Sequence, residues 1–178
     1  MLARSAVKLM KQRNNFVESI NNYLSDIFKD LSGRDEILKL VYKPSLITNN
    51  FQESEILLQL KNNLTRDLQY GFASTGPHRD EYHLILDGKK DRDYFSQGEF
   101  RITNLSLIMT INRLLFNRYS FSPVVIFDDL FSELDDEVVD SVFKYFLQLK
   151  NQIFITSTSE PLKSSSGNQF QVVEGQLV

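Results

Sequence analysis

The spacing of apolar residues predicts a helix over residues 1–31. Apolar side chains recur there at intervals of three or four positions, at Phe16, Ile20, Leu24, Ile27 and Leu31, which places them on one face of a helix. Gly33 follows, and glycine is favoured just past a helix because it adopts the left-handed backbone without steric strain. We therefore expect one continuous helix that ends near residue 32.

The next residues continue with a strand, a helix and a hairpin. We expect a strand over residues 37–42. The helical spacing of apolar residues over 53–68 predicts a helix with one apolar face. Alternating residues over 82–86 predict a second strand, and Asp-Gly at 87–88 is a favoured hairpin turn. Helical spacing then returns and ends near Arg118.

The last third of the chain predicts a parallel crossover. Four consecutive apolar residues at 124–127 indicate a strand that is buried on both faces, as in the middle of a parallel sheet. A helix over 135–149 and a short strand at 153–155 follow at the spacing of a crossover unit. We also expect a mobile loop over 164–167 and a hairpin within 170–178. The whole pattern predicts an α/β fold.

The composition is that of an ordinary globular protein. The 178 residues are 42% hydrophobic and 24% charged, and they include no cysteine, which excludes a disulfide framework and thiolate metal sites. No apolar run approaches the roughly 20 residues of a membrane span, and the first residues lack a signal peptide's apolar block. We therefore expect a cytoplasmic protein without a membrane segment. The net charge of −3 gives no general signal for nucleic-acid binding.

Two groups of polar residues carry the candidate chemistry. Ser96 and Gly98 open the helix that ends near Arg118, and a helix start offers backbone N–H groups to a phosphate. Asp128 and Asp129 follow the strand 124–127, where open α/β sheets place their ligands and where carboxylates can hold Mg²⁺ and orient a water. The alternatives are helix capping by the serine and a loop or capping role for the aspartates. The order of the two groups suggests a nucleotide site.

Other polar residues have structural interpretations beside functional ones. A basic cluster in the first helix fits a solvated face better than a nucleic-acid contact; it consists of Arg4, Lys8, Lys11 and Arg13. Residues 76–80, Gly-Pro-His-Arg-Asp, fit either a structural turn or a polar contact. His78 and His83 have no cysteine or spaced carboxylate beside them, so we do not predict that they bind a metal.

Four segments, in this order, resemble the RecF family of bacterial recombination mediators, whose fold is like the ABC-type ATPase heads of Rad50 and the SMC proteins. They are residues 76–80, residues 94–98 with Arg101, residues 126–135 and residues 152–156. The resemblance implies that residues 71–178 form the C-terminal half of an ABC-type ATPase head, with a parallel sheet and flanking helices. It also implies a lid-like helical segment over residues 1–70.

The resemblance gives each polar segment a role. The signature motif, which contacts the γ-phosphate of ATP bound by the other subunit, is matched by Ser96, Gln97, Gly98 and Arg101. Asp128 matches the Walker B carboxylate that acts through Mg²⁺, and Asp129 matches the residue that positions the attacking water. The D-loop, which crosses the dimer interface, is matched by Ser132, Glu133, Leu134 and Asp135.

The sequence departs from the family at two points. No Gly-x-x-x-x-Gly-Lys-[Ser/Thr] phosphate loop occurs in it, so we expect this chain alone to bind ATP weakly and to hydrolyse none. We also expect a missing N-terminal half to complete the head, and without that half we expect exposed apolar surface and poor solubility. Glu99 stands where the family usually has Gln, and its charge should weaken the contact with phosphate unless Arg101 compensates.

The resemblance implies an ATP-dependent DNA-binding recombination mediator. Such a protein forms an ATP-dependent homodimer, acts at single-stranded gaps in DNA repair and replication, and works with RecO- and RecR-like proteins. One alternative is a truncated or split product that only binds a partner, which the missing phosphate loop favours. Others are an SMC- or Rad50-type head, although no heptad pattern long enough for a coiled coil occurs, and a nucleotide-independent hydrolase, although no His or Cys nucleophile accompanies the aspartates.

Overall fold

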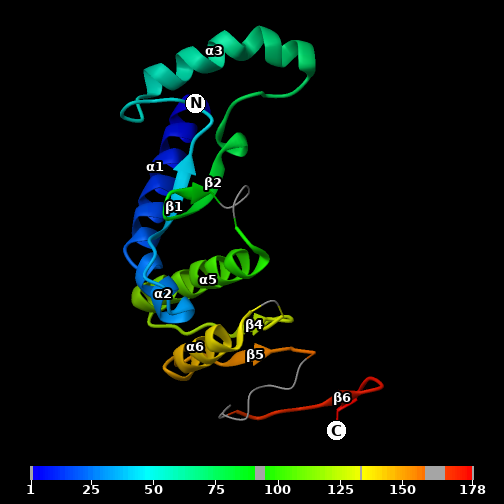
Figure 1. Ribbon diagram of the computed structural model, residues 1–178. Helices are drawn as coiled ribbons and strands as arrows, with labels where there is room; N and C mark the ends of the chain where they lie inside the picture. The colour runs from blue at the N-terminus through cyan, green and yellow to red at the C-terminus, as the bar shows by residue number, and fades with distance from the viewer. Residues whose placement is uncertain (1, 91–94, 133, 159–166, 178) are drawn as a thin grey trace.

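The computed structural model describes residues 2–90, 95–132, 134–158 and 167–177. The elements are, in chain order, α1 (Leu2–Asn21), α2 (Leu24–Ser32), β1 (Leu38–Lys43), α3 (Glu53–Tyr70), the 3₁₀ turn η1 (Pro77–Arg79), β2 (Glu81–Leu86), β3 (Lys89–Lys90), α5 (Gln97–Tyr119), β4 (Val125–Phe127), α6 (Asp136–Leu147), β5 (Ile153–Ile155), β6 (Val172–Val173) and β7 (Gln176–Leu177). Figure 1 shows α3 across one end of the molecule, and α5, α6 and the β4–β5 pair away from it. None of the described helices is long and apolar enough to cross a membrane.

The first sheet is antiparallel, in the order β1-β2-β3. Leu38 pairs with Leu86 and Leu40 with Leu84, and these four leucines are buried in the main core. The sheet confirms the predicted hairpin. Because β1 lies in residues 1–70 and β2 does not, the lid-like segment and the rest of the chain share a sheet; their division into two domains stays a prediction.

The second sheet is the parallel pair of β4 and β5, joined by α6, which confirms the predicted crossover. Val125 and Phe127 are buried, but Ile126 is 72% exposed. The prediction of a strand buried on both faces is therefore wrong. The reason is that this sheet has two strands, and the residue opposite Ile126 is Phe154, which is also exposed. The exposed apolar surface that we expected is found on this face of the sheet.

The main core joins α2, α5 and α6 to both sheets. α2 contacts both α5 and α6, and the fully buried side chains at these contacts are Ile27, Phe28, Leu31, Met109 and Val142. A smaller cluster, which includes Met10 of α1 and Ile56 of α3, holds α3 against α1. Helix α2, although short, is therefore the element on which the second half of the chain packs.

The single helix expected over residues 1–31 is wrong, because the chain turns between α1 and α2. At the end of α1, the Asn21 side chain donates a hydrogen bond to the Leu40 carbonyl and accepts one from the Leu40 N–H, each at 2.8 Å. Residues 22 and 23 form a turn, with Tyr23 at φ −129°. The break thus brings α1 and α2 against the same strand, which one straight helix could not do.

The predicted terminal hairpin is confirmed as β6 and β7. Glu174 and Gly175 form its turn with φ values of 50° and 79°, the left-handed pair that a tight hairpin requires. The loop predicted at 164–167 falls largely on residues 164–166, which lie outside the described residues. The D-loop residue Glu133 also lies outside them.

The Gly-Pro-His-Arg-Asp segment at residues 76–80 forms η1, and a buried carboxylate fixes it to the rest of the fold. The Asp80 side chain, which is 1% exposed, accepts hydrogen bonds from the Arg13 guanidinium, the Tyr42 hydroxyl and, at 2.9 Å, the Ser45 N–H. Ser45 also donates to the Gly76 carbonyl at 2.7 Å. The structural interpretation of this segment is thereby supported.

Asp80→Ala should lower the free energy of unfolding by about 3 kcal/mol, because it removes the carboxylate that pairs with the partly buried Arg13 guanidinium and accepts from the Tyr42 hydroxyl. Denaturant unfolding would measure this loss. The matched control is Asp35→Ala, which removes a carboxylate that is 87% exposed and pairs with Lys29 on the surface; its cost should stay below about 0.5 kcal/mol. Equal effects of the two substitutions would contradict a stabilising role for the buried hydrogen bonds of Asp80.

Candidate nucleotide site at the start of α5 and the end of β4

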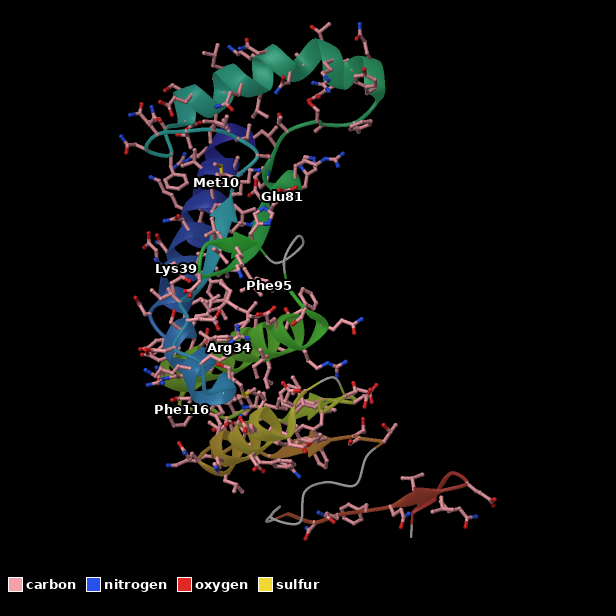
Figure 2. All side chains as sticks on the ribbon, in the orientation of Figure 1. Met10, Arg34, Lys39, Glu81, Phe95 and Phe116 are labelled. Carbon is pink, nitrogen blue, oxygen red and sulfur yellow. The ribbon has the colours of Figure 1, made fainter. Side chains whose placement is uncertain are left out.

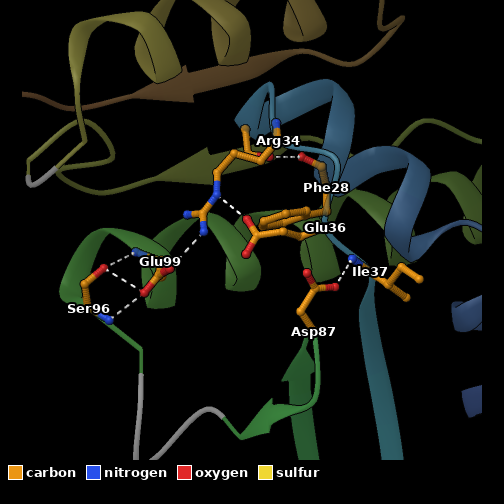
Figure 3. Close-up of polar contacts among 8 residues, drawn as sticks. Phe28, Arg34, Glu36, Ile37, Asp87, Ser96 and Glu99 are labelled. Carbon is orange, nitrogen blue, oxygen red and sulfur yellow. Dashed lines mark hydrogen bonds and ion pairs between the residues drawn. The ribbon is translucent and has the colours of Figure 1, made fainter.

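Helix α5 begins with a complete capping box. The Ser96 hydroxyl accepts a hydrogen bond from the Glu99 N–H at 3.2 Å, and the Glu99 carboxylate accepts one from the Ser96 N–H at 2.9 Å. The hydroxyl also donates to the same carboxylate at 3.1 Å. The capping interpretation of Ser96 is therefore confirmed. Figure 3 shows Ser96 and Glu99 at the start of α5, with the Arg34 side chain reaching toward Glu99.

Glu99 forms an ion pair with Arg34, which lies between α2 and β1. The Arg34 guanidinium donates to Glu99 at 3.0 Å and also pairs with Glu36. The bond from the Ser96 N–H, and next the bond from Arg34, hold the pKa of Glu99 below its usual value. From the sequence we expected this charge to weaken the phosphate contact unless Arg101 compensates; in the structure Arg34 pairs with Glu99, and the guanidinium of Arg101 donates to the backbone after β4.

Arg101 instead joins the start of α5 to the end of β4. Its guanidinium donates to the backbone carbonyl of Asp129, and more weakly, at 3.4 Å, to that of Leu130. Asn104 and Arg101 also line a cavity of about 460 Å³ between α5 and β4, together with Phe95, Ser96, Gln97, Phe100, Leu105, Ile108, Phe127, Asp128 and Leu130. Most of its wall is apolar, so the cavity suits packing against apolar side chains better than it suits a triphosphate.

The two aspartates that follow β4 have different environments. Asp128 is exposed, and its carboxylate accepts a hydrogen bond from the Thr156 hydroxyl at 2.5 Å. Asp129 donates its N–H to the same hydroxyl at 2.9 Å. Its backbone is left-handed, with φ 47°, and its Oδ1 atom is buried without a hydrogen-bond partner among the described residues.

Such an arrangement is costly for a purely structural residue. A left-handed backbone is uncommon outside glycine, though aspartate tolerates it better than most residues, and a buried carboxylate oxygen without a donor costs about 1–3 kcal/mol. In a continuing strand the side chains of Asp128 and Asp129 would point to opposite faces of the sheet. The turn at Asp129 removes this restriction. Strained and unsatisfied groups of this kind gather at functional sites.

The metal-binding capacity of the site is limited. Among the described residues, no group of three or more His, Cys, Asp or Glu side chains could hold a metal ion. Asp128 is nevertheless compatible with Mg²⁺, because that ion is commonly held by one or two carboxylates together with waters and the phosphates of a nucleotide. His78 makes its contact elsewhere, with the Ala73 carbonyl at 3.1 Å.

The segment predicted as the D-loop leads from Asp129 into α6. The Ser132 hydroxyl donates to the Asp129 carbonyl at 3.2 Å, and the Leu134 N–H donates to Phe131. Asp135 is the N-cap residue of α6, although its side chain makes no capping hydrogen bond. The fold thus brings Ser132 and Arg101 to the same carbonyl.

Sequence reasoning gave no role to two residues of this site. Thr156 holds both aspartates, and its position directly after β5, the strand next to β4, was the available signal, because the ends of adjacent parallel strands lie together. Arg34 is 65 residues from Glu99 in sequence. No local pattern could have joined them.

Comparison with known proteins gives one consistent result. The chain is 30% identical over 182 residues to the DNA replication and repair protein RecF of Trichlorobacter lovleyi. The alignment covers 99% of this chain and 50% of that protein. It is 33% identical to the RecF of Agathobacter rectalis, over 95% of this chain and 46% of that protein. The chain therefore spans about half the length of the relatives that it matches. No family model matches it.

Solved structures agree with the sequence comparison. The recombination mediator protein RecF with ATP superposes with a TM-score of 0.78 and 29% identity, over 99% of this chain and 48% of that chain. An SMC ATPase structure superposes with a TM-score of 0.53 over 92% of this chain and 83% of that chain. Its identity of 16% supports the fold alone. The α/β fold of an ABC-type head is thereby confirmed.

The capping box predicts a specific pH dependence. Because the pKa of Glu99 is lowered in the folded chain, its carboxylate stabilises the fold fully above the unfolded value of about 4.3. The stabilisation is lost as the pH falls through the lower, folded value. Glu99→Gln should therefore lose less stability than the natural chain between pH 7 and pH 3, as measured by thermal unfolding. Glu137→Gln, an exposed change in α6, should keep the natural profile; if both variants keep it, the capping account fails.

Proposed function

We propose that this chain, which is homologous to RecF proteins over 99% of its length, supplies the signature and Walker B part of a RecF-like, ATP-dependent DNA-binding recombination mediator. Asp129 carries the proposal, because its left-handed backbone and unpaired, buried Oδ1 are what a residue reserved for a ligand or a reacting water would show. It follows the strand β4, and Arg101 ties its carbonyl to α5.

The start of α5 would contact the γ-phosphate of ATP held by the other subunit. Ser96 and Gln97 are exposed there, and the free N–H groups of a helix start attract an anion. In this role the contacts come from Ser96, Gln97, Gly98 and Arg101. Arg101 would act mainly by fixing α5 to the end of β4, since its guanidinium is engaged by the carbonyls of Asp129 and Leu130.

The end of β4 would serve the nucleotide on the chain's own side. Asp128, oriented by Thr156, would hold Mg²⁺, an ion that neutralises phosphate charge when bound. Asp129 would orient the attacking water through its unpaired oxygen. The D-loop, with Ser132, Glu133, Leu134 and Asp135, would run along the dimer interface.

The partners follow from the same family. We propose an ATP-dependent homodimer that binds DNA at single-stranded gaps and cooperates with RecO- and RecR-like proteins. The phosphate loop would come from polypeptide outside these residues, which corresponds to the N-terminal half of a RecF. The exposed pair of Ile126 and Phe154 and the apolar cavity beside α5 are suitable surfaces for that half.

A second candidate function is partner binding without ATP turnover. The observation that favours it is the absence of a phosphate-loop motif from the 178 residues. Both candidates predict that the chain alone binds ATP poorly. They differ in whether the start of α5 contacts the nucleotide that another subunit binds.

The first candidate predicts that this chain associates with full-length RecF of Trichlorobacter lovleyi in the presence of Mg-ATP, because that protein would hold the nucleotide and this chain would supply the signature motif in trans. Light scattering or a pull-down with tagged chain would measure the association. Ser96→Ala should weaken it about tenfold or more by removing a phosphate contact. Ser141→Ala, a change in α6 whose hydroxyl bonds only its own helix, is the control.

Two results would count against this function. Association that is equally strong with and without ATP would favour simple partner binding. Binding of Mg-ATP by the isolated chain with micromolar affinity would show that it carries a complete nucleotide site, contrary to the assignment of a half site.

A further inference from the structure

We propose that Arg34 is a positioning residue for the signature segment: it holds Glu99 and offsets part of its charge, so that Ser96 and the start of α5 can accept the phosphate of another subunit. The inference rests on the proposed function. It concerns a residue in the lid-like part of the chain, which is far in sequence from the four segments that resemble RecF but contacts Glu99 in space.

The contact is specific in geometry. Arg34 lies between the end of α2 and the start of β1, and its guanidinium bridges two carboxylates, those of Glu36 and Glu99. The Glu99 side chain is 26% exposed and that of Arg34 41% exposed, so the pair is partly shielded from solvent. Figure 3 shows Arg34 reaching from its linker to the first turn of α5.

The linker that carries Arg34 is fixed at both ends. On one side, Gly33 ends α2 in the left-handed conformation, with φ 70°, and the Arg34 N–H donates to the Ser32 hydroxyl at 3.1 Å. On the other side, the Ile37 N–H donates to the Asp87 carboxylate at 2.8 Å. A guanidinium on so short and anchored a segment has a defined position, as a positioning residue requires.

Glu99 creates the need for such a residue. Its carboxylate lies 3.1 Å from the Ser96 hydroxyl, which donates its hydrogen to it. A phosphate that binds Ser96 must take over that hydrogen and then lies within a few ångströms of the carboxylate, where two negative charges repel. Arg34 also donates to the Glu99 carboxylate, and its positive charge offsets this repulsion. The carboxylate therefore keeps a charged donor when the Ser96 hydroxyl turns to the phosphate.

The Glu99 carboxylate gives the start of α5 a negative charge that needs a partner cation. An amide at position 99 would carry no charge and would need no partner cation. We therefore expect an energetic dependence between positions 34 and 99 that disappears when Gln replaces Glu99. That dependence can be measured as a double-mutant cycle.

The experiment uses the ATP-dependent association of this chain with Trichlorobacter lovleyi RecF, measured as the Mg-ATP concentration that gives half-maximal association. Arg34→Ala should raise this concentration about threefold at low salt, and less at high salt, where charge repulsion is screened. Glu99→Gln alone should associate at the same or lower ATP concentration. The double variant Arg34→Ala/Glu99→Gln should behave as Glu99→Gln does.

Lys29→Ala is the matched control, because it removes a neighbouring ion pair whose residues, Lys29 and Asp35, are 59% and 87% exposed. It should leave the association unchanged. Circular dichroism would show whether Arg34→Ala folds. If it does not, Glu99→Gln decides the question by itself. Weaker association of the Glu99→Gln variant than of the natural chain would overturn the inference.

The outcomes separate this inference from the function beneath it. If Ser96→Ala has no effect on association, the proposed function fails and the role of Arg34 fails with it. If Ser96→Ala weakens association but Arg34→Ala does not, only the role of Arg34 is overturned. It is also overturned if Arg34→Ala weakens association equally with Gln at position 99, because Arg34 then acts through the fold and not through the charge of Glu99.

Discussion

The hydrogen bonds from Arg101 to the backbone after β4 are the contact on which the site depends. They fix the start of α5 to the carbonyl of Asp129, and Ser132 binds the same carbonyl from the segment that leads into α6. The helix start, the strand end and the connection to α6 thus meet at one peptide group. A movement of α5 would therefore shift the backbone at Asp129, and it would couple the two segments that we propose to contact phosphate.

The rest of the fold supplies a rigid frame for this contact. α2 packs on both α5 and α6, and the Asp80 carboxylate ties η1 to α1 and β1. Figure 2 shows side chains along the whole length of this frame, with Arg34 near α5 and Met10 and Glu81 nearer to α3. The lid-like segment is thus part of the support of the site. The exposed Ile126 and Phe154 form an apolar face on the β4–β5 sheet.

Much of the fold follows from local patterns, because helical and strand periods depend on neighbouring residues. The capping role of Ser96 and the turn at Asp128 and Asp129 were also within reach of the sequence. The break after Asn21 was not, because that side chain binds a strand that forms later in the chain. The exposure of Ile126 and the pairing of Arg34 with Glu99 depend on which elements lie side by side, and apolar spacing does not encode this.

The central claim is that the start of α5 lies against ATP held by another subunit. Cross-linking from the nucleotide tests it most directly, with an ATP analogue that carries a photoreactive group on its γ-phosphate. The analogue would be bound to Trichlorobacter lovleyi RecF, mixed with this chain and irradiated, and the labelled peptide identified by mass spectrometry. The account predicts label within residues 96–101 of this chain. Label confined to the RecF partner, although the two proteins associate, would contradict it.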